Sequence, residues 1–481
     1  MKLLPILLLS FGLLLSPACA GAEAGGVIYE IFPGSFADAN GDGLGDLAGV
    51  TAKADYIASL GVSAVWLTPI YPSPSYHGYD VTDYCAIHSK MGTMEDFDAM
   101  LAALHERGLA LYLDLVLNHT SREHPWFTSA CSALASGEES PYVGYYNFSK
   151  ESGANMHTVR GAEGWYYLGE FGDHMPDLNL DSEAVRGEIE KILSFWLSRG
   201  VDGFRLDATT HYYGGDVAQN TAFLSWLMDA ARAIKPDVYI VGEAWTDDAT
   251  IARMYDSGIS SLFHFSLADS TGAIATAVRE QNGSKLARTI AAYSVSGKDA
   301  PFLTNHDMGR AAGVLMNDAG KMRAAAAAYL LAPGRPTIYY GEEIGMNGSG
   351  RDENKRLPML WGEDAYACNP PADADQAQRL KAGVIEQEAD EESLLNTYRR
   401  LVAIRNTTPE IDSEAPEALD LGVKALYAIR YGDVTVVINM GKKEVSCKYT
   451  QDANVESIGA VTLESGKLSM EPWSVAVLRA K

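Results

Sequence analysis

The 481-residue sequence has few cysteines, little positive charge and, beyond its first residues, no long apolar run. Its 5 cysteines are too few for a fold that depends on disulfides. The 38 basic residues stand against 63 acidic ones, giving a formal net charge of −25. This balance argues against nucleic acid or an anionic membrane as a partner, because both bind through basic patches. Internal repeats and low-complexity tracts are also absent, and the remaining composition is that of a globular protein.

The first 20 residues have the pattern of an export signal. Lys2 supplies the charged start, residues 3–15 are apolar, and Ala18-Cys19-Ala20 offers a small-residue cleavage site. The apolar run is short for a membrane-spanning helix of about 20 residues. We therefore expect a secreted protein with no transmembrane segment after signal removal. Acylation of Cys19 would instead tether it outside the cell, but Ser16 stands where lipoprotein signals usually carry an aliphatic residue.

If Cys19 leaves with the signal, Cys85, Cys131, Cys368 and Cys447 remain. An oxidising compartment permits disulfides, and four cysteines allow three pairings. A domain of this size does not need them, so the sequence leaves disulfides and free thiols both open.

Strand-like apolar runs alternate with amphipathic helical stretches, which predicts an α/β fold. Runs such as VSAVWLTPI are apolar throughout, as in parallel strands buried on both faces. The predicted strands are 27–36, 62–70, 110–119, 201–208, 239–244, 261–267, 301–307 and 337–343. The helix candidates between them include 93–107, 182–199, 220–234 and 320–331. Eight strands are the number of a (β/α)8 TIM barrel.

Two regions depart from this alternation. Residues 120–181, after the third strand, are rich in Gly, Ser, Tyr and Asn, and a segment this long predicts an inserted loop domain. Residues 401–481 contain short alternating runs such as ALYAIRY and VTVVINM, which predict a C-terminal antiparallel β-sandwich domain. The catalytic barrel is thus expected over 26–119 and 182–400.

Three acidic residues each follow one of the apolar runs: Asp207 in GFRLDA, Glu243 in VGEAW and Asp307 in LTNHD. The carboxyl ends of parallel barrel strands converge on one mouth, where barrel enzymes carry out their chemistry. Cleavage of a glycosidic bond needs a carboxylate and a protonated carboxyl group facing each other across the bond. The pattern therefore indicates an enzyme that cuts sugar polymers.

From about residue 27 to its end, the chain resembles the α-amylase family of glycoside hydrolases (family 13). The motifs that carry the resemblance are DLVLNH (114–119), GFRLDATTH (203–211), GEAW (242–245) and LTNHD (303–307), in the family's order and approximate spacing. MPDLN (175–179) combines features of oligo-1,6-glucosidases and neopullulanases, and resembles a group of α-amylases placed between those two.

The resemblance implies a role for each acid: Asp207 as nucleophile, Glu243 as general acid and then base, and Asp307 as the group that grips the distorted sugar. Arg205 lies two residues before Asp207, so on a strand both side chains point to the same face. A guanidinium there would keep the nucleophile ionised and oriented. Glu243 must instead keep its proton near neutral pH, which requires a raised pKa.

Four further side chains match the family's sugar-binding positions. His119 and His306 are implied as hydrogen-bond donors to hydroxyls of the sugar at the cleavage point. Tyr79 and Asp80 lie in HGYDVTDY, which matches a family segment where an aromatic ring stacks on the sugar. Apolar sugar faces pack well on such rings.

The loop DANGDGLGD (38–46) spaces oxygen ligands at alternate positions, with a glycine for a sharp turn. It is not an EF-hand, because Gly49 stands where the bidentate Glu would be. It resembles a calcium loop of relatives of oligo-1,6-glucosidases, which implies as ligands Asp38, Asn40, Asp42, the Leu44 carbonyl and Asp46.

A second calcium is a further expectation where barrel and insert meet. In α-amylases such an ion is held by residues matching Asn118, Asp177 and the backbone carbonyl of His211. The remaining ligands would come from the variable insert, so the number of calcium ions stays open.

The leading hypothesis is a secreted, calcium-containing α-amylase, expected to be a monomer, that hydrolyses internal α-1,4 bonds of starch and maltooligosaccharides with retention. Ala208, after the nucleophile, is small, and relatives that cleave α-1,6 bonds tend to carry a bulkier Val there. The enzymatic alternative is an exo-acting α-glucosidase, or a cyclomaltodextrinase or neopullulanase-like enzyme, on short maltodextrins. A non-catalytic glucan-binding relative is the other alternative, although such relatives have usually lost the catalytic carboxylates.

Overall fold

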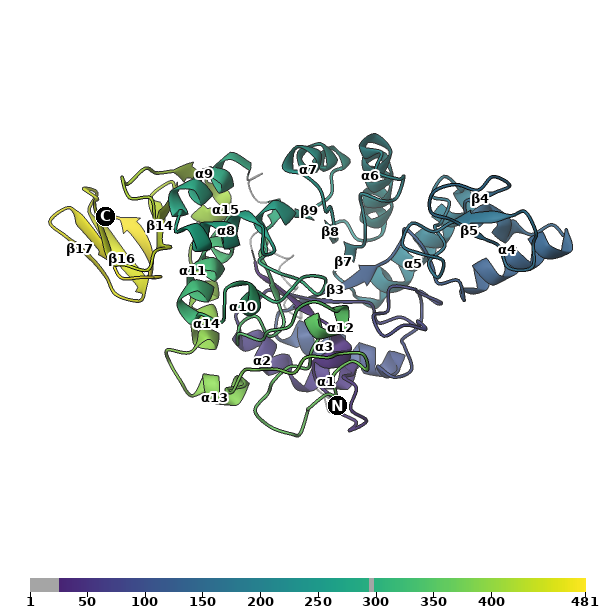
Figure 1. Ribbon diagram of the computed structural model, residues 1–481, viewed down its shortest axis with the longest axis horizontal. Coiled ribbons are helices and arrows are strands. Elements are labelled where there is room, and N and C mark those ends of the chain that lie inside the picture. Colours follow the sequence, from purple (N-terminus) through teal and green to yellow (C-terminus); the bar gives the residue numbers. More distant parts are fainter. Residues whose placement is uncertain (1–25, 294–297) are drawn as a thin grey trace, which may run out of the picture.

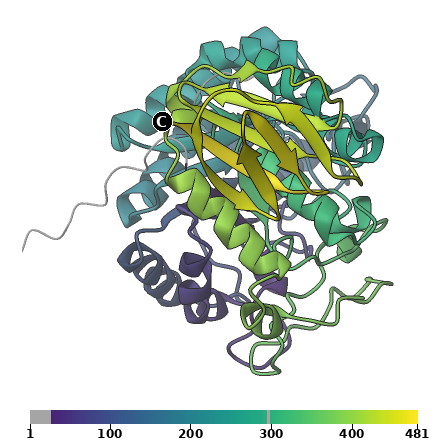
Figure 2. The same cartoon turned by 90° about the vertical axis from the view of Figure 1, so that its left-hand side faces the viewer.

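The computed structural model describes residues 26–293 and 298–481. The predicted export signal, with Cys19, lies outside the described residues. Figure 1 shows a barrel of strands and helices at the centre, with the segment that carries α4, β4 and β5 on one side and the C-terminal sheets on the other. In Figure 2 these C-terminal sheets (yellow) face the viewer and lie in front of the barrel and its helices.

Eight parallel strands form one sheet, in the order β10-β9-β8-β7-β3-β2-β1-β11, which confirms the predicted barrel. Their bounds are β1 (Ile28–Ile31), β2 (Ala64–Leu67), β3 (Ala110–Leu115), β7 (Gly203–Leu206), β8 (Tyr239–Gly242), β9 (Ser261–Phe263), β10 (Asp299–Ala300) and β11 (Thr337–Tyr339). The two edge strands meet through a parallel bridge between Phe302 and Thr337, which nearly closes the barrel. Interior side chains such as Ile28, Trp66 and Tyr112 are buried and form a core inside the sheet.

All eight strands are shorter than their predicted ranges, and two of them show why. The seventh was expected over 301–307, but β10 ends at Ala300 and only Phe302 still bridges to its neighbour. Pro301 explains the interruption, because it has no N–H to donate to a ladder, although its carbonyl accepts from the Thr337 amide. The sixth was expected over 261–267, yet β9 ends at Phe263 and a short 3-10 turn, η4 (Phe265–Leu267), follows.

The close approach of β7 and β8 requires a glycine. A Cβ atom on Gly203 would lie 1.9 Å from the carbonyl oxygen of Tyr239, its partner in the ladder. Gly203 therefore allows the close spacing of β7 and β8 at the start of β7, the strand that carries Arg205 and leads to Asp207.

Helices surround the barrel (Figure 1). Their bounds are α1 (Leu47–Ala52), α2 (Ala54–Ser59), α3 (Met94–Glu106), α4 (Pro125–Ser136), α5 (Glu183–Arg199), α6 (Val217–Ile234), α7 (Asp248–Met254), α8 (Ala273–Glu280), α9 (Gly283–Tyr293), α10 (Ala311–Val314), α11 (Ala319–Leu330), α12 (Asp352–Lys355), α13 (Val384–Glu388), α14 (Leu394–Asn406) and α15 (Glu410–Ser413). The four predicted helices correspond to α3, α5, α6 and α11. A capping box between Thr93 and Asp96 begins α3, since each side chain accepts from the other's backbone N–H.

Between β3 and α5, the chain leaves the barrel and forms its own small sheet, in the order β4-β6-β5. The strands are β4 (Phe148–Ser149), β5 (Met156–Thr158) and β6 (Tyr166–Leu168), and α4 packs beside them. A bridge from His119 to Asp177 draws the two ends of the segment together, and a second bridge joins Tyr146, in its middle, to Leu178. The segment therefore returns to the barrel next to the point where it left.

The C-terminal region consists of antiparallel sheets, as predicted. One has the order β12-β13-β14-β19-β16 and the other β15-β18-β17. Their bounds are β12 (Glu417–Ala418), β13 (Leu426–Tyr431), β14 (Val434–Asn439), β15 (Val445–Lys448), β16 (Ala453–Ile458), β17 (Val461–Glu464), β18 (Lys467–Met470) and β19 (Val475–Ala480). The predicted boundary at residue 401 falls inside α14, whose Tyr398 hydroxyl donates to barrel residue Glu342 at 2.8 Å.

The four cysteines of the described chain, Cys85, Cys131, Cys368 and Cys447, are free thiols. Burial raises the pKa of the Cys131 thiol to about 11. No helix within residues 26–293 and 298–481 combines the length and the apolar character needed to span a membrane.

Candidate active site

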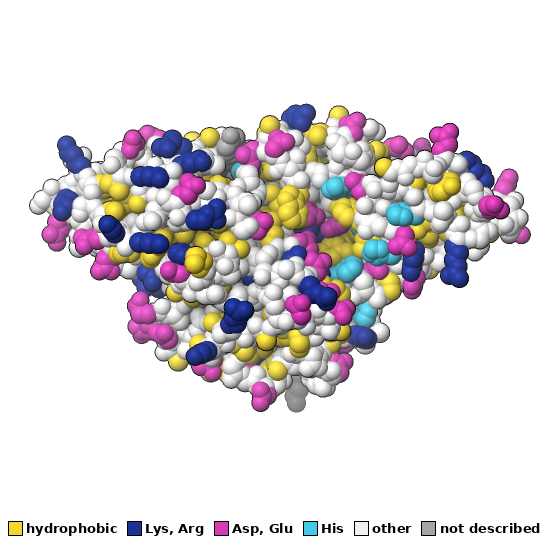
Figure 3. All heavy atoms as spheres, viewed as in Figure 1, with side chains coloured by type: hydrophobic (Ala, Val, Ile, Leu, Met, Phe, Trp, Pro, Cys, Tyr) yellow, Lys and Arg dark blue, Asp and Glu magenta, His cyan; other side chains and the backbone are white. Residues whose placement is uncertain are grey.

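A cavity of about 310 Å³ lies at the carboxyl ends of the barrel strands. Asp207, Glu243 and Asp307 all line it, together with Tyr79 and His119. Figure 3 shows a hollow in the middle of this face, with histidine side chains gathered along one side of it. The structure therefore brings together the three acids that the sequence analysis placed at strand ends.

One guanidinium links the first two acids. Arg205, buried on β7, donates from Nη1 to Oδ1 of Asp207 at 2.8 Å, and its Nη2 lies 3.0 Å from Oε2 of Glu243. The same Nη1 lies 2.7 Å from Oδ1 of Asp114, a buried residue of β3. The Asp114 carboxylate thus partly neutralises the guanidinium and fixes its position, so that Arg205 contacts both Asp207 and Glu243 at the cavity.

Glu243 follows β8 directly and is fixed by the neighbouring turn. Its Oε2 accepts a hydrogen bond from the backbone N–H of Ala208 at 2.9 Å. Ala208 has a φ of 49°, in the left-handed region that residues with a side chain rarely adopt. The turn after β7 therefore directs its amide towards the acid at the end of β8.

Asp307 lies on the opposite side of the cavity and has two cationic neighbours. Arg356 donates from Nη2 to Oδ1 of Asp307 at 2.9 Å. Nε2 of His306 lies 3.1 Å from the other carboxylate oxygen. Arg356 also donates to the Tyr76 hydroxyl at 2.9 Å, which ties the loop after β2 to the loop that follows β11.

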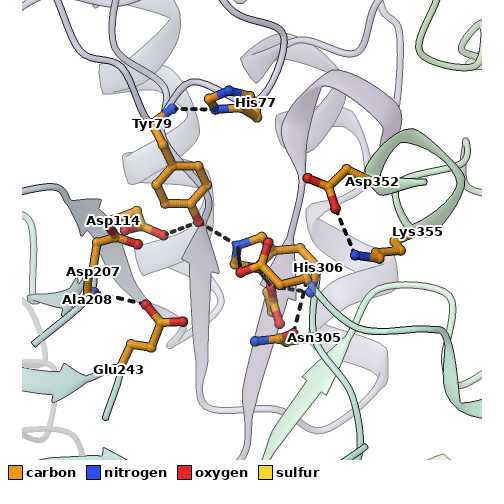
Figure 4. A network of polar contacts seen from close by, with 12 residues as sticks. His77, Tyr79, Asp114, Asp207, Ala208, Glu243, Asn305, His306, Asp352 and Lys355 are labelled. Carbon is orange, nitrogen blue, oxygen red and sulfur yellow. Dashed lines mark hydrogen bonds and ion pairs between the residues drawn. The ribbon is translucent and has the colours of Figure 1, made fainter. Parts of the chain in front are cut away.

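Tyr79 is the centre of a chain of polar contacts (Figure 4). Its hydroxyl lies 2.9 Å from Oδ2 of Asp114 and 2.7 Å from Nε2 of His306. Its ring lies nearly parallel to the His306 ring, with centroids 5.5 Å apart. Tyr79 lines the cavity, whereas Arg205 and His306 are buried behind it.

Two other predicted sugar-binding residues have mainly internal partners. His119 lines the cavity, and its Nε2 lies 3.2 Å from the Tyr79 carbonyl oxygen. Asp80 does not line the cavity: it is buried and accepts hydrogen bonds from the hydroxyls of Ser73 and Ser75. These hydroxyls turn the Asp80 carboxylate into the loop after β2, away from the cavity lining, and its sugar contact stays a prediction.

The surroundings shift the pKa values of the three carboxyl groups in different ways. Burial and the negative charges of Asp207 and Asp307 raise the pKa of Glu243, against the opposing effect of Arg205. Burial raises the pKa of Asp207 to about 6, with Arg205 opposing, so Asp207 is ionised at neutral pH. Burial also disfavours ionisation of Asp307, but His306 and Arg356 outweigh it and hold the pKa of Asp307 well below its usual range. A raised pKa at Glu243, beside the ionised carboxylates of Asp207 and Asp307, is the arrangement that acid-assisted glycosidic cleavage needs.

Comparison with known proteins decides the family. The profile of the alpha amylase catalytic domain matches residues 30–414. The chain belongs to the alpha-amylase family of glycoside hydrolases. It is thus a retaining glycoside hydrolase, in agreement with the interpretation of the three carboxylates.

Relatives within the alpha-amylase family are named for different activities. Alpha-amylase 3 of Dictyoglomus thermophilum is 36% identical, covering 94% of this chain and 93% of its own length. The glucan 1,6-alpha-glucosidase of Streptococcus pneumoniae is 32% identical, covering 93% of this chain and 97% of its own. The structure of Eubacterium rectale Amy13B superposes with a TM-score of 0.90 at 38% identity, covering 96% of each chain.

The predicted first calcium loop of this alpha-amylase family member is compact and rich in oxygen. Asp38 accepts from the backbone amides of Asn40, Gly41 and Gly43, at 3.0, 2.7 and 2.6 Å. Asp46 accepts from Gly49 at 2.6 Å, and the charges of Asp38, Asp42 and Asp46 all act on the nearby thiol of Cys368. Carboxylate, amide and backbone oxygens are the donor set that Ca²⁺ prefers, so the residues fit the ion.

At the predicted second calcium position, fewer of the expected ligands lie close together than in the loop at 38–46. The Asn118 amide nitrogen lies 3.2 Å from Asp177, and Nδ1 of His211 lies 2.9 Å from Glu170 of the insert. Burial raises the pKa of Asp177 to about 7. No group of three or more His, Cys, Asp or Glu side chains suited to a metal is present in the part of the chain that the structure describes. Both positions would therefore rely on amide and backbone oxygens as well.

The structure adds cavity residues that the sequence analysis did not assign. These additional lining residues are His77, Phe171, Met175, Trp245, Asp352 and Arg356. Trp245 is 52% exposed and stacks on Phe265 with centroids 4.7 Å apart. Trp245 and Met175 stand inside the motifs GEAW and MPDLN that resemble the family, but a single residue in a loop has no periodic pattern that reveals its partners.

Proposed function

We propose that the protein is a secreted α-amylase that hydrolyses internal α-1,4-glucosidic bonds of starch and maltooligosaccharides with retention of configuration. The observation that carries the proposal is the contact of Arg205 with both Asp207 and Glu243 at one cavity wall. This geometry supplies a nucleophile and a proton donor on neighbouring strands, as the two-step mechanism requires.

In the first step, a carboxylate oxygen of Asp207 attacks the anomeric carbon while Glu243 protonates the departing glycosidic oxygen. The bond between sugar and leaving group breaks, and a covalent glycosyl ester forms on Asp207. In the second step, the Glu243 carboxylate takes a proton from water, whose oxygen attacks the same carbon and releases Asp207. Two inversions give retention, and Glu243 regains its proton.

Asp307 would act on the ring that changes shape between these steps. Its carboxylate is kept ionised by Arg356 and His306, so it can accept hydrogen bonds from sugar hydroxyls. Such bonds strengthen as the ring distorts towards the oxocarbenium-like transition state.

The α-1,4 preference is supported by the small side chain of Ala208, which lines the cavity next to the nucleophile. A pocket difference of a few methyl groups shifts preference by about 1–3 kcal/mol, so it biases the linkage that is cut. Relatives named alpha-amylase support the same activity.

The second candidate is an exo-acting α-glucosidase, or a cyclomaltodextrinase or neopullulanase-like enzyme, on short maltodextrins. The relatives named glucan 1,6-alpha-glucosidase and oligo-1,6-glucosidase favour it. A time course of products from amylose, maltotriose, isomaltotriose and a cyclodextrin separates the two. Early mixed oligosaccharides from amylose support the α-amylase, whereas glucose or maltose alone from the start, with faster attack on short substrates, supports the second candidate.

Calcium is proposed as a structural ion of the loop at 38–46. Asp38, Asn40, Asp42, Asp46 and the Leu44 carbonyl would hold it, and a second ion would use Asn118, Asp177 and the His211 carbonyl. The bound ion supplies charge neutralisation for acidic side chains that lie close together. It would stabilise the loop next to β1 and takes no part in bond cleavage.

Export is proposed on the pattern of residues 1–20 alone. Cell fractionation followed by intact-mass measurement tests it. A mature protein in the medium that begins after Ala20 supports secretion, and a membrane-bound form with a lipid-modified Cys19 supports tethering instead.

A further inference from the structure

Glu30 lies on β1, behind the cavity wall, and is completely buried. Its Oε1 is 2.6 Å from Nδ1 of His306 and 3.3 Å from the backbone N–H of the same residue. Its Oε2 has no hydrogen-bond partner among the residues that the structure describes. A buried carboxylate is costly unless it has a specific partner, and His306 supplies that partner here.

The other ring nitrogen of His306 has two neighbours. Nε2 lies 2.7 Å from the Tyr79 hydroxyl and 3.1 Å from Oδ2 of Asp307. The Tyr79 hydroxyl in turn lies 2.9 Å from Oδ2 of Asp114 (Figure 4). Three short contacts thus share the proton of one phenol and the protons of one imidazole.

Counting protons assigns the state of the ring. A neutral imidazole that donates Nδ1–H to Glu30 would turn a lone pair at Nε2 towards the Asp307 carboxylate. Tyr79 has one hydroxyl proton, which it could then donate to His306 or to Asp114 but not to both. The contact without that proton would bring two acceptors together, in addition to the contact between Nε2 and Asp307. An imidazolium removes both conflicts, because Nε2–H points at Tyr79 and Asp307 while Tyr79 donates to Asp114.

We propose that Glu30 is a positioning residue of the active site: its carboxylate binds Nδ1–H of His306 and fixes the ring with a second N–H directed at Tyr79 and Asp307. The role rests on the proposed function, since it assigns how the sugar-gripping side of the cavity is oriented. Glu30 itself lies outside the cavity lining and acts through His306.

The charges around His306 agree with this assignment. The groups that face it are the carboxylates of Glu30, Asp307 and Asp114, the phenol of Tyr79, the Trp66 ring and the guanidinium of Arg356. Burial favours the neutral ring, but Asp307 and Glu30 outweigh it and raise the pKa of His306 to about 9. Loss of the Glu30 charge in Glu30→Gln would remove one of these two anions and leave only a neutral amide oxygen to accept from Nδ1–H.

The test uses Glu30→Gln with Glu343→Gln as a matched control. Glu343 is also a fully buried barrel carboxylate with one unpartnered oxygen, but its other oxygen accepts from Tyr29 and Tyr56, at 2.6 and 2.7 Å. We expect Glu30→Gln to lower kcat/KM roughly 10- to 100-fold, mainly through kcat, as for a displaced group next to substrate. The pKa of the His306 ring, followed by ¹⁵N NMR, should fall in Glu30→Gln, because one of its two anionic neighbours is lost, whereas Glu343→Gln should leave it unchanged.

A double-mutant cycle separates action through His306 from a general loss of packing. In the His306→Asn background, Glu30→Gln should change kcat/KM by less than about 2-fold, because the residue it acts through is gone. Additive losses, or equal losses in Glu30→Gln and Glu343→Gln, would overturn the proposal.

Nitrogen NMR of the unsubstituted protein tests the ring directly and does not depend on folding of a variant. With ¹⁵N-labelled histidine and His306→Asn for assignment, both ring nitrogens of His306 should be protonated at neutral pH. A neutral ring would overturn the proposal even if the enzyme is active. If the protein hydrolyses no glucan, the proposed function fails while the NMR result still decides the state of His306.

Discussion

The Tyr79 hydroxyl and Nε2 of His306 lie 2.7 Å apart, with their rings 9° from parallel. This contact joins the loop after β2 to the loop after β10, which are separated by 227 positions in the sequence. It also joins the Arg205–Asp114 side of the cavity to the Asp307 side. The wall behind the cavity is therefore one connected hydrogen-bond network.

Asp207→Asn should abolish turnover while leaving the fold intact. The amide is a poor nucleophile, so kcat should fall by at least on the order of 10³-fold, while sugar binding persists. Steady-state kinetics, calorimetric titration with a maltooligosaccharide and thermal denaturation check this. Asp433→Asn, an exposed change in the C-terminal sheets, serves as control and should behave as the unsubstituted enzyme. Retained turnover in Asp207→Asn would contradict the nucleophile assignment.

The pH dependence of kcat/KM should be bell-shaped. Asp207 must be ionised to attack, and its pKa of about 6 places the acid limb near that value. Glu243 must hold its proton, and its raised pKa sets the alkaline limb. Because the two groups interact, the measured values belong to the pair. Rates measured from about pH 4 to about pH 9 test this, and an acid limb at the ordinary pKa of an aspartate would contradict it.

Arg356→Gln should weaken the grip of Asp307 on the substrate. A charged hydrogen bond of about 1.5–3 kcal/mol is lost, so kcat/KM should fall roughly 10- to 100-fold. The pKa of Asp307 should rise, since Arg356 helps to hold it low. Because the pKa of Asp307 is lower in the folded than in the unfolded protein, its ionisation stabilises the fold at pH values above the unfolded-state pKa. This stability is lost as the pH falls towards the folded-state pKa. In Arg356→Gln the folded-state pKa is higher, so the loss should occur at a higher pH than in the unsubstituted enzyme. Kinetics and thermal melts at several acidic pH values measure both effects.

Two comparison variants make the Arg356 result specific. Tyr76→Phe removes the hydroxyl that Arg356 Nη1 contacts, and should cost less than about 10-fold because a neutral partner is lost. Arg351→Gln changes an exposed arginine near the same helix, α12, and should have no effect. Equal losses in all three variants would indicate a general disturbance of the loop.

Removal of calcium should destabilise the protein. An ion bound only by the folded state adds about 2.7 kcal/mol when present at 100 times its Kd, so excess chelator should lower Tm. Asp38→Asn should lower Tm in calcium and reduce the further effect of chelator. Asp433→Asn should keep the full chelator response. An unchanged melting curve with no calcium by metal analysis would contradict both proposed sites.

Two glycine substitutions should have opposite effects on the stability of the fold. Gly203→Ala places a Cβ 1.9 Å from the Tyr239 carbonyl oxygen and should destabilise the fold by about 1–3 kcal/mol or more. Gly187→Ala lies inside α5 with nothing within 4 Å of the new atom, and should stabilise it by up to about 1 kcal/mol. Denaturant unfolding measures both, and a tolerated Gly203→Ala would show that β7 and β8 can separate.

Much of the fold could be predicted because its signals are local. Continuous apolar runs gave the eight strands their approximate positions, and amphipathic periodicity gave α3, α5, α6 and α11. The errors fell where a backbone detail interrupts a pattern. Pro301 cannot donate to a ladder, so β10 ends before it, and α14 runs through the boundary expected at residue 401.

The candidate site divides in the same way. Asp207 and Glu243 directly follow strands, so their convergence at one end of the barrel was predictable from chain position. Asp307 is separated from β10 by a loop, and its place depends on Arg356 and His306. Asp80 has the sequence context of a sugar-binding residue, yet Ser73 and Ser75 bind its carboxylate within the loop.

By itself, the sequence determined the alternation of strands and helices, the family motifs and the identity of the three acids, because each depends on residues that are close in the chain. Only the tertiary structure decided the partners of these groups. Glu30 meets His306 across 276 positions, and Arg205 meets Asp114 across 91. Burial and neighbouring charge act through space, so the protonation of Glu243, Asp307 and His306 is set by contacts that no local pattern records.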